Sequence, residues 1–302
     1  MKQHGTAAAF GVASLAVGTF AIMDALMKEL SLEIGAYNAV LWRTMLGAAF
    51  AGSLFFGRRS AWPSRAAWPI HLRRGILGVP TAMFFFWGLA RVPLAQGVAL
   101  AFVAPLIALY LAAILLKERV ERRAILASLL GFAGVIVIFD GQAQAELGQE
   151  ALLGSVAILL SAGLYAYNII LMRQQAQVAG PVEVAFFTSF LMAIGFALAA
   201  PLVAELPPAS LLPQILGAAV LSIVSLLLFS WAYARAEAQY LAPVEYTAFI
   251  WASLLGWLIF AEEVRALTLA GAVMIVAACL LAARRSMKPA PKGEVGVPGG
   301  VT

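Results

Sequence analysis

The chain has 302 residues, of which 63% are hydrophobic and 12% are charged, with a net charge of +5 and a mean hydropathy of +0.93. Soluble globular proteins are about half apolar and a quarter charged, so this composition excludes a soluble enzyme and indicates an integral membrane protein. The basic residues lie mainly in short segments between apolar runs, which argues against a nucleic-acid-binding surface. With Cys279 as its one cysteine, the chain cannot form an intrachain disulfide.

Ten apolar runs follow one another along the chain. Each approaches the length of about 20 residues that a helix needs to cross a bilayer. The runs are 7–28, 36–56, 73–92, 95–116, 123–140, 151–172, 181–203, 211–234, 239–261 and 266–283. The sequence therefore predicts an all-α, polytopic membrane protein with ten transmembrane helices.

The two halves of the chain repeat each other. At an offset of 145 residues, FAIMDALMK (20–28) aligns with YAYNIILMR (165–173), and at an offset of 144, WGLAR (87–91) aligns with WAYAR (231–235). Each half has five runs, an odd number, so the second half must be inverted in the membrane, as in many secondary transporters. The predicted parts are a first five-helix repeat at 1–140, an external linker at 141–150, a second, inverted repeat at 151–284 and a disordered cytoplasmic tail at 285–302.

The Lys and Arg residues between the runs predict the orientation of the chain. If the N-terminus is cytoplasmic, 16 of the 20 basic residues, Arg74 among them, lie in the cytoplasm. Three, Lys28, Arg91 and Arg265, lie outside, and Arg43 lies within a run. Because membrane proteins concentrate Lys and Arg in their cytoplasmic loops, both termini are predicted to be cytoplasmic.

The segment 84–134 resembles the third to fifth helices of EamA-type proteins in the drug/metabolite transporter superfamily. It contains an aromatic-rich helix, a tight turn, a helix with a central Pro105, and Leu-x-x-Glu-Arg at 115–119. The second copy of this block matches at 260–264 but has Phe249 where the first copy has its proline.

This resemblance extends over about 7–284 and is strongest to bacterial exporters of amino acids, particularly aromatic ones. It implies ten helices around a central cavity that opens alternately to each side of the bacterial inner (plasma) membrane. It further implies a secondary transporter that exports small amphipathic metabolites, chiefly amino acids including aromatic and hydrophobic ones. The alternative is uptake or exchange of nucleotide-derived or carboxylate metabolites, which a strongly cationic cavity would favour.

The expected partners are the lipid bilayer and a small-molecule substrate, with no nucleic acid, no cofactor and no metal, in a monomer or weak dimer. The sequence has no nucleotide-binding glycine loop, which argues against ATP-driven transport. An intramembrane enzyme would need a nucleophile with a base or paired aspartates, and Asp24 is the one Asp in a predicted helix interior. His4 and His71 fall outside the apolar runs, so we expect no imidazole in the membrane for proton relay or metal binding.

Arg43 and Asp24 lie at comparable depths in the first two runs, which a short hairpin at about 29–35 joins. A charge in hydrocarbon costs several kcal/mol unless it is paired or hydrated. We therefore predict that the two residues face each other or share a hydrated vestibule. The pair either binds the carboxylate and amine of a zwitterionic substrate, or gates the outer side, or simply fixes the hairpin.

Other candidate residues are an acid, an amide and aromatic side chains within the runs. Glu245 either binds a substrate ammonium or carries a proton, or else stabilises a helix N-terminus. Aromatic rings suit an apolar or aromatic substrate, and an amide in a span can read a substrate carboxylate or amine. The predicted substrate-binding or gating residues are Asp24, Arg43, Phe84, Tyr165, Asn168, Glu245, Tyr246 and Phe249.

Glu118 and Glu262 occupy equivalent positions at the ends of the fourth and ninth runs. We predict that they fix the helix ends by pairing with the nearby Arg119 and Arg265 rather than bind substrate.

Overall fold

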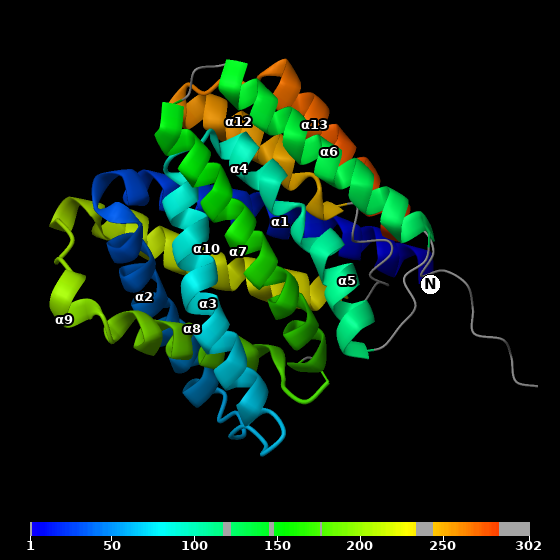
Figure 1. Ribbon diagram of the computed structural model, residues 1–302. Coiled ribbons are helices and arrows are strands. Elements are labelled where there is room, and N and C mark those ends of the chain that lie inside the picture. Colours follow the sequence, from blue (N-terminus) through cyan, green and yellow to red (C-terminus); the bar gives the residue numbers. More distant parts are fainter. Residues whose placement is uncertain (1, 117–121, 145–147, 176, 234–243, 284–302) are drawn as a thin grey trace, which may run out of the picture.

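The computed structural model of this protein describes residues 2–116, 122–144, 148–175, 177–233 and 244–283. Within these ranges every regular element is helical (Figure 1). The predicted tail at 285–302, together with Glu118 and Arg119, lies outside them.

The helices follow the apolar runs, because in hydrocarbon a backbone must satisfy its polar groups internally. They are α1 (Lys2–Glu33), α2 (Gly35–Gly57), α3 (Trp68–Leu89), α4 (Leu94–Ala101), α5 (Ala104–Leu116), α6 (Arg122–Gln144), α7 (Gly148–Gln175), α8 (Pro181–Ala197), α9 (Ala200–Val203), the 3-10 turn η1 (Ala209–Leu211), α10 (Leu212–Tyr233), α12 (Ala248–Phe260) and α13 (Ala266–Ala283).

Among the described residues, four helical stretches are long and apolar enough to cross a membrane, judged by length and composition. They are Ala8–Glu33, Gly35–Gly57, Gly148–Met172 and Ala209–Ala232. Shorter apolar helices, among them α8 and α13, lie between them in the sequence. The prediction of an all-α, polytopic membrane protein is confirmed, and the count of ten spans stays a prediction.

The run predicted as one span at 95–116 is interrupted, because a turn at 102–103 separates α4 from α5. Pro105 explains this turn, since a proline lacks the N–H that would bond the carbonyl four residues earlier. At the offset of 144 residues, the second half has a turn at 246–247, immediately before α12. The two halves are therefore interrupted at equivalent positions.

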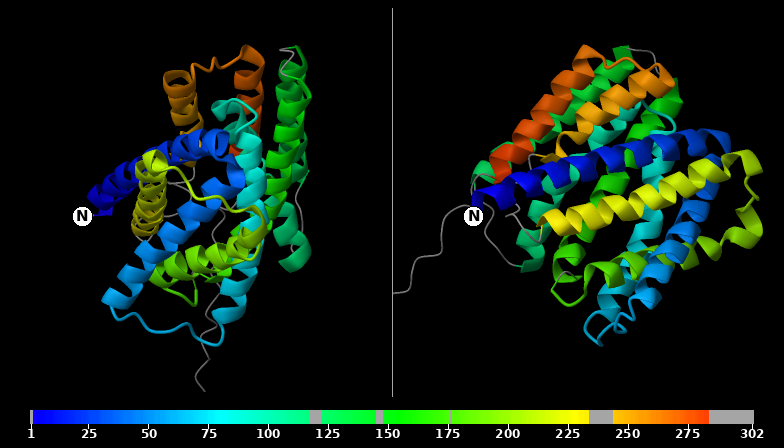
Figure 2. Two further views of the ribbon diagram at one scale, coloured as in Figure 1. Left: turned by 90° about the vertical axis from the view of Figure 1, so that its left-hand side faces the viewer. Right: turned by 180° about the vertical axis from the view of Figure 1, so that it is seen from behind.

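The most extensive helix contacts join the first half of the chain to the second. α1 packs along α10, α3 along α7, α2 along α8 and α6 along α13 (Figure 2). Glycines allow two of these pairs to approach closely. A Cβ on Gly88 of α3 would lie 2.5 Å from the carbonyl oxygen of Gly154 in α7, and a Cβ on Gly271 of α13 would lie 2.5 Å from that of Gly134 in α6.

We expect Gly88→Ala to lower the thermal stability of the purified protein. The added methyl group would force the α7 backbone to move, and overpacking of this kind costs about 1–3 kcal/mol. Gly163→Ala in α7 is the matched control, since a Cβ there meets nothing within 4 Å. Thermal unfolding in detergent measures both variants, and equal midpoints would contradict the close packing of α3 on α7.

The helix junctions gather at two opposite ends of the molecule. In Figure 1 the α1–α2 and α12–α13 junctions lie toward the upper left, whereas the α2–α3 and α7–α8 junctions lie at the bottom. We call the first the Lys28 end, after a residue in the last turns of α1, and the second the His71 end, after a residue in the first turn of α3.

Candidate functional site

A group of polar side chains lies where α3, α7 and α8 meet at the His71 end. It comprises His71 and Arg74 from α3, Asn168 and Gln175 from α7, and Glu183 from α8, and we call it the His71 cluster. The helix register positions it, because residues three or seven apart share one face of a helix. Glu183 lies in the first turn of α8, so that its carboxylate reaches the start of α3.

Hydrogen bonds link these side chains into one continuous network. Arg74 donates from Nε to Asn168 Oδ1 at 3.0 Å and from Nη1 to Gln175 Oε1. Gln175 Nε2 lies 2.6 Å from His71 Nδ1, and His71 Nε2 lies 2.9 Å from Glu183 Oε1. His71, Gln175 and Arg74 are 0%, 1% and 8% exposed. Shielded from water, such hydrogen bonds are stronger than their exposed counterparts.

His71 is buried although the sequence places it outside the apolar runs, and the expectation that no imidazole lies in the membrane stays a prediction. His71 precedes the apolar run, but α3 begins before it and carries its ring between α7 and α8. Arg74, which the orientation count treats as a loop charge, is buried too, because the amide oxygens of Asn168 and Gln175 replace water around the guanidinium. The sequence held one signal of this, namely the seven-residue spacing of those two amides on α7.

Tyr165 lies near Arg74 and near Glu245. The Tyr165 hydroxyl, on α7 one turn before Asn168, interacts electrostatically with both the Arg74 guanidinium and the Glu245 carboxylate. Tyr165 is 41% exposed, and Glu245 is exposed as well. Two predicted site residues, Asn168 and Tyr165, therefore interact with Arg74, and a third, Glu245, interacts with Tyr165.

The predicted aromatic residues are not gathered with them in one place. The ring of Tyr246 packs edge-on against that of Phe102, with centroids 5.3 Å apart, so the turn of one half touches the turn of the other. Phe249 packs against an apolar cluster formed largely by α4, α6 and α13. Phe84 is 38% exposed and pairs with no other ring in the described part of the chain.

Asp24 and Arg43 are near each other, as the short hairpin led us to expect. Their charges interact electrostatically, but the described residues contain no ion pair between them. Arg43 Cζ lies 5.5 Å from the centroid of the Phe86 ring, a cation–π arrangement. Asp24 is 6% exposed, and neither Asp24 Oδ1 nor Arg43 Nε has a hydrogen-bond partner among the described residues.

A second group of polar contacts, the Lys28 junction, lies at the other end of the molecule. Lys28 of α1 forms an ion pair with Glu262, which follows α12. Lys28 Nζ also donates to the Val92 carbonyl at 2.6 Å, and the Leu94 N–H donates to Glu262 Oε2 at 2.7 Å. The Phe260 ring lies 5.0 Å from the ammonium. The junction therefore ties the end of α1 to the α3–α4 turn and to the end of α12.

The predicted partner of Glu262 was wrong, since this carboxylate pairs with Lys28 rather than with Arg265.

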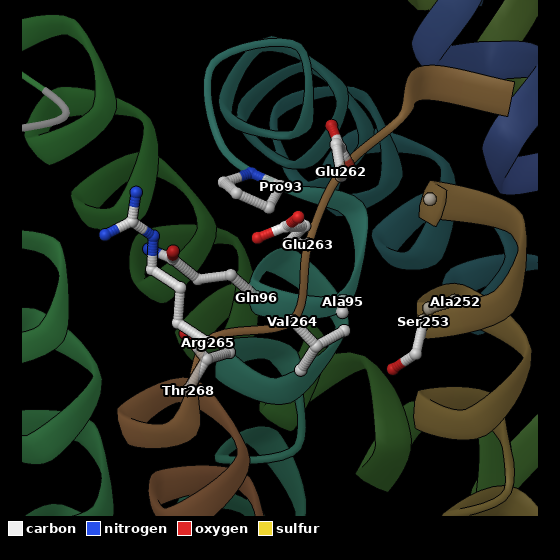
Figure 3. A pocket seen from close by; sticks show the side chains of 11 residues that line it. Pro93, Ala95, Gln96, Ala252, Ser253, Glu262, Glu263, Val264, Arg265 and Thr268 are labelled. Carbon is white, nitrogen blue, oxygen red and sulfur yellow. The ribbon is translucent and has the colours of Figure 1, made fainter. Parts of the chain in front are cut away.

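Figure 3 shows a pocket beside the junction, lined by residues of α4, α12 and the segment that follows α12, with Glu262 and Glu263 pointing in different directions. Among the lining residues, Gln96 is 2% exposed and donates to Ser155 Oγ at 3.2 Å.

Comparison with known proteins shows that the sequence of this chain is similar to those of transporters. The EamA-like transporter family matches the chain twice, at residues 8–140 and 152–284. The pseudopaline exporter of Pseudomonas aeruginosa is 28% identical over 90% of this chain and 95% of its own length. The riboflavin transporter of Rhizobium johnstonii is 28% identical over 89% of this chain and 88% of its own length. The S-adenosylmethionine uptake transporter of Rickettsia bellii is 23% identical over 85% of this chain and 87% of its own length.

A crystal structure of a protein with 20% sequence identity superposes with a TM-score of 0.62, covering 93% of this chain and 99% of the other. That likeness concerns the fold alone. The relatives named above are transporters rather than enzymes, and they differ in cargo. Because the family matches both halves over almost the whole chain, this protein belongs to the EamA-like transporter family, as its sequence predicts.

Proposed function

We propose that this protein exports small amphipathic zwitterions, chiefly amino acids including aromatic and hydrophobic ones, across the bacterial inner membrane by alternating access. The observation that carries the proposal is the grouping of Arg74, Asn168, Tyr165 and Glu245. Tyr165 interacts with one positive and one negative charge, those of Arg74 and Glu245, and Asn168 accepts a hydrogen bond from Arg74. A zwitterion with an aromatic side chain complements all four.

Each group has a distinct task in this proposal. Arg74 binds the substrate carboxylate, because a guanidinium presents paired N–H groups that match carboxylate geometry. Glu245 accepts the substrate ammonium, so that cargo and site neutralise each other. Asn168 holds Arg74 through Nε and so fixes the plane of the guanidinium. The Tyr165 ring stacks on apolar cargo.

Alternating access is supported by equivalences between the two halves of the chain. If 1–140 and 151–284 are inverted repeats, the α1–α10 contact corresponds to the α7–α3 contact, and both are extensive. The turns at 102–103 and 246–247 are likewise equivalent. Interrupted helices at the repeat interface are typical of secondary transporters. In the orientation that the basic residues predict, the His71 end is cytoplasmic and the Lys28 end is external.

The test is flux of labelled L-phenylalanine and of further amino acids through proteoliposomes. We expect flux above that of empty vesicles, and poor competition by phenylalaninamide, which lacks the carboxylate. Arg74→Gln should weaken transport more than tenfold, since loss of a buried charged contact costs about 2 kcal/mol or more. Arg73→Gln is the matched control, because the neighbouring Arg73 is exposed. Amino acid flux equal to that of empty vesicles would contradict the proposal.

Uptake or exchange of nucleotide-derived or carboxylate metabolites is the second candidate. Arg74 and Lys28 are buried and Arg43 is half-buried, and a cationic interior suits anionic cargo. Two relatives are named as transporters of riboflavin and of S-adenosylmethionine. Flux of either compound in the same vesicles, with no flux of amino acids, would favour this candidate.

A further inference from the structure

We propose that His71 is a proton-binding site linked to cargo binding, such that a cargo carboxylate that takes Arg74 from Gln175 causes His71 to gain a proton. This inference rests on the proposed role of Arg74 as the carboxylate-binding group. It assigns a task to the His71 cluster beyond holding three helices together.

The first step concerns the orientation of the Gln175 amide. A guanidinium has only N–H donors, so the Gln175 atom that faces Arg74 Nη1 must be the oxygen. The NH2 group of the same amide then faces His71, and His71 Nδ1 must accept its hydrogen bond. The proton of the neutral imidazole is therefore on Nε2, which donates to Glu183 Oε1. Arg74 thus selects one tautomer of His71 through Gln175.

The second step concerns what a further proton would do. A proton on His71 Nδ1 would face the NH2 group of Gln175, and two donors cannot bond each other. Gln175 would have to turn its oxygen toward His71, which would direct its NH2 group at Arg74, again donor against donor. The imidazolium and the guanidinium would also repel each other across one amide. Protonation of His71 and the Arg74–Gln175 hydrogen bond therefore exclude each other.

The groups around His71 leave the ring few other hydrogen-bond partners. The charged and titratable groups that face the ring among the described residues are Glu183 from α8 and Arg74 from α3 itself, and α7 contributes the neutral amide of Gln175. Ring centroids of Trp68 and Phe187 lie 6.4 Å and 5.0 Å from that of the imidazole. His71 is 0% exposed, so water cannot replace a lost partner freely.

A cargo carboxylate resolves the conflict. When it binds Arg74, it supplies acceptors for the N–H groups that Gln175 had occupied and neutralises the guanidinium charge. Gln175 is then free to turn, and His71 can bind a proton on Nδ1 while Nε2 continues to donate to Glu183. Cargo and proton are therefore bound together. A lower pH on the side from which the cargo binds should therefore accelerate its transport to the other side.

Binding of L-phenylalanine to purified protein at pH 6 and pH 8 tests the linkage. We expect about tenfold tighter binding at pH 6, a coupling of ordinary size for linked sites. Calorimetry in buffers of different ionisation enthalpy should report proton uptake on binding in the wild type, with no variant needed. Equal affinity at both pH values, or proton release on binding, would overturn the proposal.

Variants separate the linkage from the fold and from the proposed function. Gln175→Met keeps the histidine but removes the hydrogen bonds that join it to Arg74, so most of the pH dependence of binding should be lost while the protein stays folded by thermal shift. Gln174→Met is the matched control, because that glutamine is exposed, and it should keep the full pH dependence. A Gln175→Met protein that retains the pH dependence contradicts the linkage. Absence of phenylalanine binding at both pH values defeats the proposed function, and the linkage with it.

Discussion

Glu262→Gln is expected to lower the free energy of unfolding by about 3 kcal/mol, because removal of one partner of a buried ion pair leaves an uncompensated charge. Lys28 is 3% exposed and would keep only hydrogen-bond acceptors, such as the Val92 carbonyl, around its ammonium. Removal of the other partner, by Lys28→Met, should lower the free energy of unfolding by less. The Glu262 side chain is 20% exposed and keeps its hydrogen bond from the Leu94 N–H. Denaturation in detergent, followed by tryptophan fluorescence, measures both.

Two further proteins make this comparison decisive. The double variant Lys28→Met/Glu262→Gln should be more stable than Glu262→Gln alone, because no charge is left unpaired. Glu263→Gln is the matched control, since Glu263 is adjacent and exposed, and it should unfold as the wild type does. If Glu262→Gln and Glu263→Gln are equally stable, the Lys28 junction contributes nothing to stability.

Arg43→Met is expected to destabilise the protein by less, about 1 kcal/mol, because it removes a nearby charge rather than the partner of an ion pair. The Asp24 carboxylate, 6% exposed, would lose the positive charge that interacts with it, and the ring of Phe86 would lose its cation. Arg43→Met/Asp24→Asn should recover most of the loss. Arg58→Met, an exposed arginine just beyond α2, is the matched control and should have little effect. Unfolding midpoints of the four proteins provide the measurement.

Transport by the double variant distinguishes the two interpretations of this pair. If Asp24 and Arg43 fix the first hairpin, Arg43→Met/Asp24→Asn should transport phenylalanine at close to the wild-type rate. That is the expected result, because Arg74 and Glu245 are proposed to meet the charges of the cargo. A folded double variant without flux would move the cargo site to Asp24 and Arg43.

Local features of this fold could be predicted from the sequence. Apolar runs gave the helices, and the short hairpin between the first two runs gave the nearness of Asp24 to Arg43, because neighbouring antiparallel helices bring residues of equal depth together. Pro105 marks one of the two helix interruptions. At the equivalent turn at 246–247, Phe249 stands where the first half has Pro105, so the second interruption lacks the signal that marks the first.

The polar groups at both ends could not be predicted in the same way. Lys28 and Glu262 are 234 residues apart, and His71 and Glu183 are 112 apart. A charged residue near the end of an apolar run has the same sequence pattern whether it faces water or another helix. Only the packing of α3 between α7 and α8, and of α1 near α12, decides that Arg74 and Lys28 are buried.

The contact between Phe102 and Tyr246 has a consequence for how the molecule can bend. Each residue belongs to the turn that interrupts its half of the chain, and their rings touch with centroids 5.3 Å apart. As long as the two rings stay in contact, a change of angle between α4 and α5 displaces the segment that leads into α12, and the reverse also holds. The contact therefore couples bending at the two turns.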